Sequence, residues 1–223
     1  MIMVENDKLL GVHLAEDDDA QRIRAWWKKN GMGIISGIAL GVLGVGGFKG
    51  WEMYTERRAL TASNLYQEML ARQSAGSSAQ AKNLALRLKD DYGATPYSDL
   101  AGLMLAKLAV EEERSGDAEG YLKEIMAEAE DHSMRHIARL RLAQIELAEG
   151  NYQKAEKLLS VEEYGGFESE YSEILGDVYV EQKLWKKART AYDRALESLD
   201  SSAGADQILT AKRNLAMQSA GDQ

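Results

Sequence analysis

Two histidines at helical spacing are the residues of this chain best suited to hold a metal ion. His132 and His136 are four residues apart, with Glu128 and Asp131 close by. On a helix, two histidines at this spacing can share a zinc ion. However, Asp131, His132 and Ser133 suggest a turn between helices, where the helical spacing need not hold. Ser133 also stands where the metalloprotease pattern H-E-x-x-H requires Glu. We therefore predict no metal site and no cofactor.

Motifs that carry out catalysis are missing from the sequence. There is no G-x-S-x-G nucleophile turn, no Walker loop and no G-x-G-x-x-G turn. The glycines of the stretch 44–47 lie inside an apolar run, so they are not expected to hold a phosphate. The acidic cluster Glu111–Glu113 is most simply solvated surface. The sequence therefore favours a binding protein over an enzyme, and we predict no catalytic residues.

An apolar run of eighteen uncharged residues, Gly31–Phe48, precedes the largest part of the chain. As a helix rising about 1.5 Å per residue, it just reaches across a hydrocarbon core of about 30 Å. Trp26 and Trp27 precede the run, and Trp51 and Tyr54 follow it, as rings at the two membrane interfaces would. A glycine-rich buried helix of a soluble protein is the alternative interpretation.

We predict that residues 31–50 form a single transmembrane helix that acts as an uncleaved signal anchor. The run is longer than the apolar region of a usual signal peptide, and no A-x-A-like cleavage site follows it. Four basic residues cluster in the short segment before the run, and three lie after it, which by the positive-inside rule places residues 1–30 in the cytoplasm and residues 51–223 across the membrane. These basic residues are Arg22, Arg24, Lys28 and Lys29, then Lys49, Arg57 and Arg58.

The short cytoplasmic segment contains one predicted amphipathic helix. Residues 1–15 show no clear pattern. Asp17–Asp19 are suited to a helix N-terminus, because carboxylates favour that end. Ile23, Trp26 and Trp27 then fall on one face of a helix that would lie near the membrane surface.

Three glycines at intervals of four lie on one face of the predicted transmembrane helix. Gly33, Gly37 and Gly41 would allow another helix to approach closely. Because glycine is common in membrane helices, the alternative is that these residues have no packing role. We predict lateral helix packing in the lipid bilayer at this face.

The charge of the chain lies in its larger part. The formal net charge is −9, and residues 59–223 hold 19 basic and 28 acidic residues. Such a surface argues against nucleic acid as a partner, because phosphates demand Lys and Arg. The chain has no cysteine, which excludes disulfides and thiolate metal sites.

Internal periodicity is the strongest pattern in residues 51–223. Leu175, Gly176, Tyr179, Ala188 and Tyr192 are spaced as in the tetratricopeptide repeat, which they resemble. Small residues are expected where the two helices of a hairpin cross, and tyrosines between neighbouring hairpins. Thirty-three residues earlier the pattern recurs with Leu142, Ala143, Gly150, Tyr152, Ala155 and Leu159.

An earlier, looser copy places Gly116 34 residues before Gly150, with Tyr121 where a small alanine is expected. Generic helical hairpins are the alternative. We predict an all-α protein, with one N-terminal transmembrane helix followed by a tetratricopeptide-repeat α-solenoid. The expected repeats lie near residues 97–129, 136–163 and 170–199. Because a single repeat cannot bury its apolar face, residues 51–92 and 205–217 are expected to cap the two ends.

A partner-binding groove is expected on the first helix of each hairpin, which lines the concave face in tetratricopeptide domains. The last repeat would present an acidic face and the middle repeat an apolar one, so capture of a carboxylate is disfavoured. The predicted groove residues are Ile137, Leu140, Gln144, Leu147, Glu170, Glu173, Asp177, Val180 and Glu181. Solvated surface is the alternative for the acidic residues.

Three stretches resemble the YfgM family, ancillary subunits of the SecYEG translocon. They are WWKKNG at 26–31, LKDDYGATPYSDLAGLMLAKLAVE at 88–111 and ILTAKRNLA at 208–216. The resemblance implies an inner-membrane protein whose periplasmic repeat domain associates with the translocon and with a membrane-anchored chaperone of the prolyl-isomerase type. It implies no catalytic residues. The expected function is to help such a chaperone engage exported polypeptides; a scaffold or regulator of an envelope complex, without contact to nascent chains, is the alternative.

Overall fold

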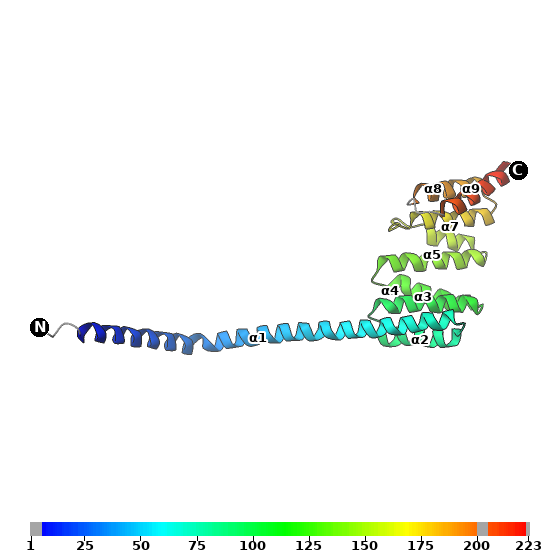
Figure 1. Cartoon of the computed structure of the whole chain (residues 1–223). Coiled ribbons are helices and arrows are strands. Elements are labelled where there is room, and N and C mark those ends of the chain that lie inside the picture. Colours follow the sequence, from blue (N-terminus) through cyan, green and yellow to red (C-terminus); the bar gives the residue numbers. More distant parts are fainter. Residues whose placement is uncertain (1–5, 200–204, 222–223) are drawn as a thin grey trace. The chain divides into compact units, whose positions relative to one another are not determined.

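The computed structural model describes residues 6–199 and 205–221, in which every regular element is an α-helix (Figure 1). The all-α prediction is therefore confirmed. The chain comprises two compact units, Met1–Arg57 and Arg58–Gln223. The first helix, α1, spans Asn6–Ser74. The expectation that a helix starts near Asp17–Asp19 is wrong, because α1 is already helical from Asn6 on.

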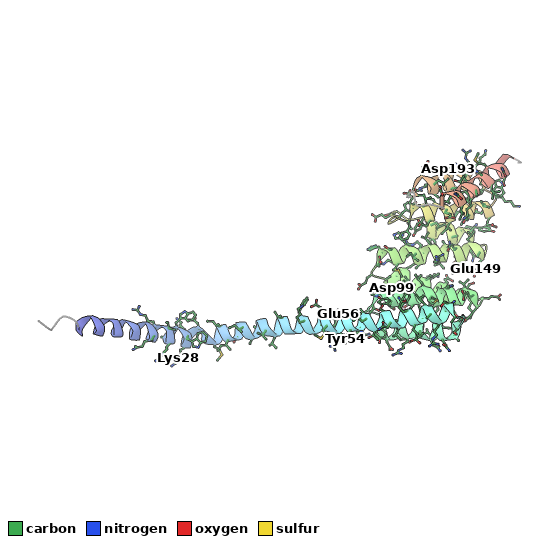
Figure 2. The ribbon with its side chains drawn as sticks, in the orientation of Figure 1. Lys28, Tyr54, Glu56, Asp99, Glu149 and Asp193 are labelled. Carbon is green, nitrogen blue, oxygen red and sulfur yellow. The ribbon has the colours of Figure 1, made fainter. Side chains whose placement is uncertain are left out.

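The apolar part of α1 exposes its side chains all round. Met32, Leu40 and Phe48 are 68–78% exposed. By length and composition, α1 contains a stretch that can cross a membrane, with only 6% of that window buried. In Figure 2 the side chains of α1, among them the labelled Lys28 and Tyr54, extend away from the helix axis. An unpartnered apolar surface of this kind needs lipid or another helix to cover it.

The second unit continues with eight further helices in the described residues. Each contacts the next along the chain, and Figure 1 shows them following one another in chain order. Their bounds are α2 Ser78–Tyr92, α3 Pro96–Glu111, α4 Ser115–Glu128, α5 His132–Ala148, α6 Tyr152–Leu159, α7 Glu168–Glu181, α8 Trp185–Glu197 and α9 Ala205–Gly221. Pro96 opens α3, a position where its missing N–H costs no hydrogen bond.

Three of the connecting turns share one geometry. Two residues after the end of α3, α5 and α7 the backbone takes a positive φ, at Glu113 (58°), Gly150 (77°) and Lys183 (59°). In each turn the next backbone N–H donates to a carbonyl five residues before it, as Asn151 does to Glu146 at 2.8 Å. This is the hydrogen bond of a Schellman ending. Only Gly150 adopts the left-handed conformation without a steric cost.

These turns correct the predicted register of the first repeat. The residue equivalent to Gly150 is Glu113, not Gly116, so the first interval is three residues longer than expected. Ala118 then takes the place of Ala155, and Tyr121 no longer stands at a small position. Ala118, Ala155 and Ala188 are all fully buried. The sequence pattern was misleading because a nearby glycine stood in for the turn residue.

Small residues allow the helices of the last hairpin to meet closely. A Cβ on Gly176 of α7 would lie 2.4 Å from the ring of Tyr192 on α8. The prediction of a small residue at this crossing is confirmed. Tyr192 lies within its own hairpin and also contacts the cluster formed with α9, which contains Ala188, Ala195, Leu209 and Ala216.

The two ends of the repeats are covered by helices from either side. Ala62 and Met69 of α1 pack with Ala81, Ala85 and Leu88 of α2 and with α3. At the other end, α9 buries Leu209 and Ala216, whereas Ile208 and Leu215 are more than 60% exposed. The helix α9 thus covers α8 with one narrow stripe and leaves a second stripe in solvent.

Candidate functional site

The predicted acidic face lies on α7, and half of it is already paired within the chain. Glu173 and Asp177 are about one third exposed, because α9 covers them. Lys212 of α9 places its Nζ 2.7 Å from Glu173 Oε1 and 2.8 Å from Asp177 Oδ2. Both carboxylates are therefore paired within the chain and are not free surface groups. Their mutual repulsion is relieved by a lysine of the capping helix.

Asp177 has a second partner on the neighbouring helix. The hydroxyl of Tyr192 donates to Asp177 Oδ1 at 2.7 Å. Burial and this hydrogen bond raise the pKa of Tyr192, so the phenol stays protonated. Burial by itself would lower the pKa of Lys212, but its hydrogen bonds to Asp177 and Glu173 outweigh that effect and raise it. Asp177 therefore joins three helices, α7, α8 and α9.

The outer members of the acidic face remain in solvent. Glu170 and Glu181 are exposed and make no ion pair within residues 6–199 and 205–221. Val180 packs against the cluster between α8 and α9. The structure thus places the predicted acidic residues on one face of α7 but divides them between solvent and the α9 contact.

On α5 the predicted groove residues lie mainly in the interior. Leu140 is 7% exposed and, with Leu147, belongs to a cluster containing Tyr171, Ile174 and Val178 of α7. Ile137 is half-buried. Gln144 is exposed and accepts a hydrogen bond from Arg141 at 3.1 Å. The apolar residues of this face therefore hold α5 to α7, and Gln144 remains for contact with a partner.

The histidines are both on α5, so the turn predicted at Asp131, His132 and Ser133 ends at Asp131, two residues earlier than expected. Asp131 caps the helix, accepting a hydrogen bond from the N–H of Ser133 at 2.8 Å. His136 Nδ1 lies 2.9 Å from the Tyr171 hydroxyl, and its ring stacks on Phe167. Burial, and then the charge of Arg139, lower the pKa of His136. Within the described residues, no three His, Asp or Glu side chains are grouped to hold a metal.

The glycine face of α1 is open. A Cβ on Gly33, Gly37 or Gly41 would meet no atom within 4 Å. At about 100° per residue, Gly44 falls on the same face and Gly46 on the opposite one. This face leaves room for another helix at short distance, and packing of a helix there stays a prediction.

Lys212 is the residue of the site that the sequence analysis missed. It lies 35 residues after Asp177 in the chain, and no local spacing links the two. One pattern in the sequence does point to it. Leu209 and Ala216 set the buried stripe of α9, and Lys212 lies between them at three and four residues, on the same side of the helix.

Comparison with known proteins identifies relatives along nearly the whole chain. Residues 24–217 match the family model described as a tetratricopeptide repeat-like domain. The chain is 30% identical to the ancillary SecYEG translocon subunit of Aggregatibacter actinomycetemcomitans, over 83% of this chain and 90% of that protein. It is 25% identical to the protein of the same name from Escherichia coli K12, over 89% of this chain and 95% of that protein. No solved structure matches.

Proposed function

Because the chain belongs to the family of the ancillary SecYEG translocon subunits, we propose that it is a membrane-tethered, non-enzymatic interaction module associated with this translocon. The observation that carries the proposal is the similarity to these subunits over at least 83% of the chain. The tetratricopeptide repeat-like domain supports a role in binding protein. The exposed apolar part of α1 supports an anchor in the same membrane as the translocon.

The proposal extends to location and to a second partner. The protein lies in the bacterial inner membrane with residues 1–30 in the cytoplasm and residues 51–223 in the periplasm. There it brings a membrane-anchored chaperone of the prolyl-isomerase type to exported polypeptides. The cluster of basic residues before the apolar run supports the orientation. The chaperone partner rests on the family resemblance.

Photo-crosslinking in native membranes tests the proposal. A crosslinking amino acid is placed at Gln144 and, separately, at Glu170, two exposed positions of the predicted groove. A third variant carries it at Gly37, on the glycine face of α1. The expected products join the protein to subunits of SecYEG and to the chaperone. A matched control carries the crosslinker at Gly46, on the opposite face of α1.

The products separate the proposed function from its alternative. Crosslinks to translocating polypeptides, or to the chaperone during translocation, support a role in export. Crosslinks to SecYEG subunits alone indicate a scaffold or regulator. No product with any SecYEG subunit, at all three positions and with detectable protein in the membrane, would contradict the proposed association.

A further inference from the structure

A hollow of about 530 Å³ lies in the second unit between α4, α5 and α6. It is on the side of α5 that carries Arg139 and Glu146, about 150° around the helix from the predicted groove position Gln144. Four basic and two acidic side chains line it: Lys123, Arg139, Lys154 and Lys157, with Glu119 and Glu146. A positive hollow is unexpected in a domain whose net charge is strongly negative.

The hollow arises because the second repeat, α5 and α6, differs from the third repeat, α7 and α8, in one buried residue and in the length of its second helix. Glu146 stands 33 residues before Tyr179, at the position where the repeat pattern has an aromatic ring. Lys154 likewise corresponds to Lys187, whose Nζ lies 5.3 Å from the centre of the Tyr179 ring. α6 has 8 residues, whereas α8 has 13. A carboxylate and a shorter helix thus occupy the place where a ring and a longer helix pack in the third repeat.

The charges of the hollow are only partly neutralised from within. Lys123 pairs with Glu119 at 2.5 Å, and Lys154 Nζ lies 3.3 Å from Glu146 Oε2. Burial raises the pKa of Tyr171, and the nearby Arg139 guanidinium partly offsets this rise. In the part of the chain that the structure describes, neither Arg139 nor Lys157 makes an ion pair with a carboxylate. Two positive charges therefore remain for a ligand.

The buried carboxylate restricts which ligand fits. Glu146 is 4% exposed and is paired with Lys154, whose Nζ donates to Oε1 at 3.5 Å and lies 3.3 Å from Oε2. Oε2 itself accepts no hydrogen bond from the described residues. A carboxylate in this position favours an N–H donor and repels a bare anion. Leu142, Leu158 and Val161 add aliphatic surface to the lining. A polypeptide supplies all three chemistries, since it has backbone N–H groups, acidic side chains and apolar side chains.

We propose that this hollow binds an acidic segment of a partner polypeptide, with carboxylates near Arg139 and Lys157 and aliphatic side chains on Leu142, Leu158 and Val161. The site goes beyond the proposed function, because it specifies a ligand chemistry at residues outside the predicted groove. It also uses a different face of α5. A peptide is favoured over a lipid headgroup because its carboxylates complement the basic side chains and its backbone N–H groups can donate to Glu146 Oε2.

Selection from a random peptide library displayed on phage tests the site, with the full chain immobilised in detergent. The expected peptides are enriched in Asp and Glu together with Leu, Ile and Val. The best peptide is then synthesised with a fluorescent label, and its binding is measured by anisotropy. Lys157→Glu is expected to raise Kd about tenfold, because an attraction becomes a repulsion. Binding is also expected to weaken as salt is added.

Two further variants keep the test independent of folding defects. Glu146→Tyr restores the aromatic residue of the third repeat and is expected to fill the hollow and raise Kd at least about tenfold, with the helical circular dichroism unchanged. Lys186→Glu is the matched control, since Lys186 is an exposed lysine of α8 outside the hollow. Its Kd is expected to equal that of the unaltered chain.

Several results would contradict the proposed binding of an acidic peptide in the hollow. They are failure to enrich any peptide, enrichment without an acidic excess, or equal binding to the unaltered, Lys157→Glu and Glu146→Tyr chains. Vesicles of phosphatidylglycerol form a separate arm: binding of vesicles that Lys157→Glu abolishes, without peptide binding, would assign the hollow to lipid. None of these outcomes bears on the crosslinks to SecYEG, so the two proposals fail separately.

Discussion

Lys212 of α9 lies 2.8 Å from Asp177 of α7, with its ammonium group also 2.7 Å from Glu173. This contact changes the meaning of the acidic face. Carboxylates that repel each other on an isolated helix instead hold the capping helix to the last repeat. The face is therefore structural at its centre, and only Glu170 and Glu181 are left to meet a partner.

Replacing Lys212 with Ala is expected to lower the free energy of unfolding by about 2 kcal/mol, because two half-buried carboxylates lose a charged hydrogen-bond donor. Urea denaturation followed by circular dichroism measures the change. Lys186→Ala, at an exposed position, is the control and should change stability by less than about 0.5 kcal/mol. An equally small effect of both variants would show that the contact of Lys212 with Glu173 and Asp177 contributes nothing to the stability of the domain.

Reversing Glu173 and Asp177 to Lys is expected to destabilise the domain. Three ammonium groups would then meet at the α7–α9 contact, and Tyr192 would lose its acceptor. Glu170→Lys with Glu181→Lys is the matched pair, since both residues are exposed. The second pair should leave the thermal midpoint nearly unchanged and is therefore the proper probe of partner capture.

Gly176→Ala is expected to cost about 1–3 kcal/mol, because the new Cβ would lie 2.4 Å from the ring of Tyr192. Gly120→Ala in α4 is the control, since a Cβ there meets no atom within 4 Å. Alanine at that position should stabilise the helix by up to about 1 kcal/mol. Chemical denaturation should therefore show changes of opposite sign in the free energy of unfolding of the two variants. Equal changes would contradict the close packing of Gly176 against Tyr192.

Lys183→Gly is expected to stabilise the domain by about 0.5–1 kcal/mol, since glycine adopts the positive φ of this turn without a steric cost. The same change at Lys187, in the interior of α8, should instead destabilise by about 1 kcal/mol. Comparison of the two variants by thermal unfolding separates turn geometry from loss of a lysine. Destabilisation by Lys183→Gly would contradict the conformation of the turn.

The stability of the domain is expected to fall as the pH is lowered through 6.5, the ordinary pKa of histidine, because the pKa of His136 in the folded chain is lower. Between the two pKa values the unfolded chain binds a proton that the folded chain does not, so protons favour unfolding. Above this interval His136 is neutral in both states. Burial is the main cause of the lowered pKa of His136, and the charges of Arg139 and His132 add to it.

Urea denaturation across this pH interval, with and without His136→Asn, measures the effect. The free energy of unfolding of the His136→Asn variant is expected to depend less steeply on pH than that of the unaltered chain. His132→Asn, at an exposed position of the same helix, is expected to have a smaller effect, since the charge of His132 is the last and least of the causes that lower the pKa of His136. A pH dependence that His136→Asn leaves unaltered would assign it to other groups.

Sequence periodicity was sufficient for the helical class and the apolar span, because these depend on neighbours a few residues apart. It also located the small residues of the repeats. It assigned the turn residue of the first repeat three residues too late, because the turn is formed by Glu113, and the nearby Gly116 resembled it. Turn conformation depends on how two helices are joined, which a residue type indicates only weakly.

Contacts between helices far apart in the chain were decided by the tertiary structure. Lys212 reaches Glu173 and Asp177 only because α9 packs against the last hairpin, and nothing within α7 indicates a lysine 35 residues away. The hollow beside Glu146 likewise depends on where α6 ends and how α4 approaches α5. The sequence by itself determined which residues lie on each helix face, because the helical period is local. Which faces meet, and what charge remains exposed, depends on the packing of the helices in three dimensions.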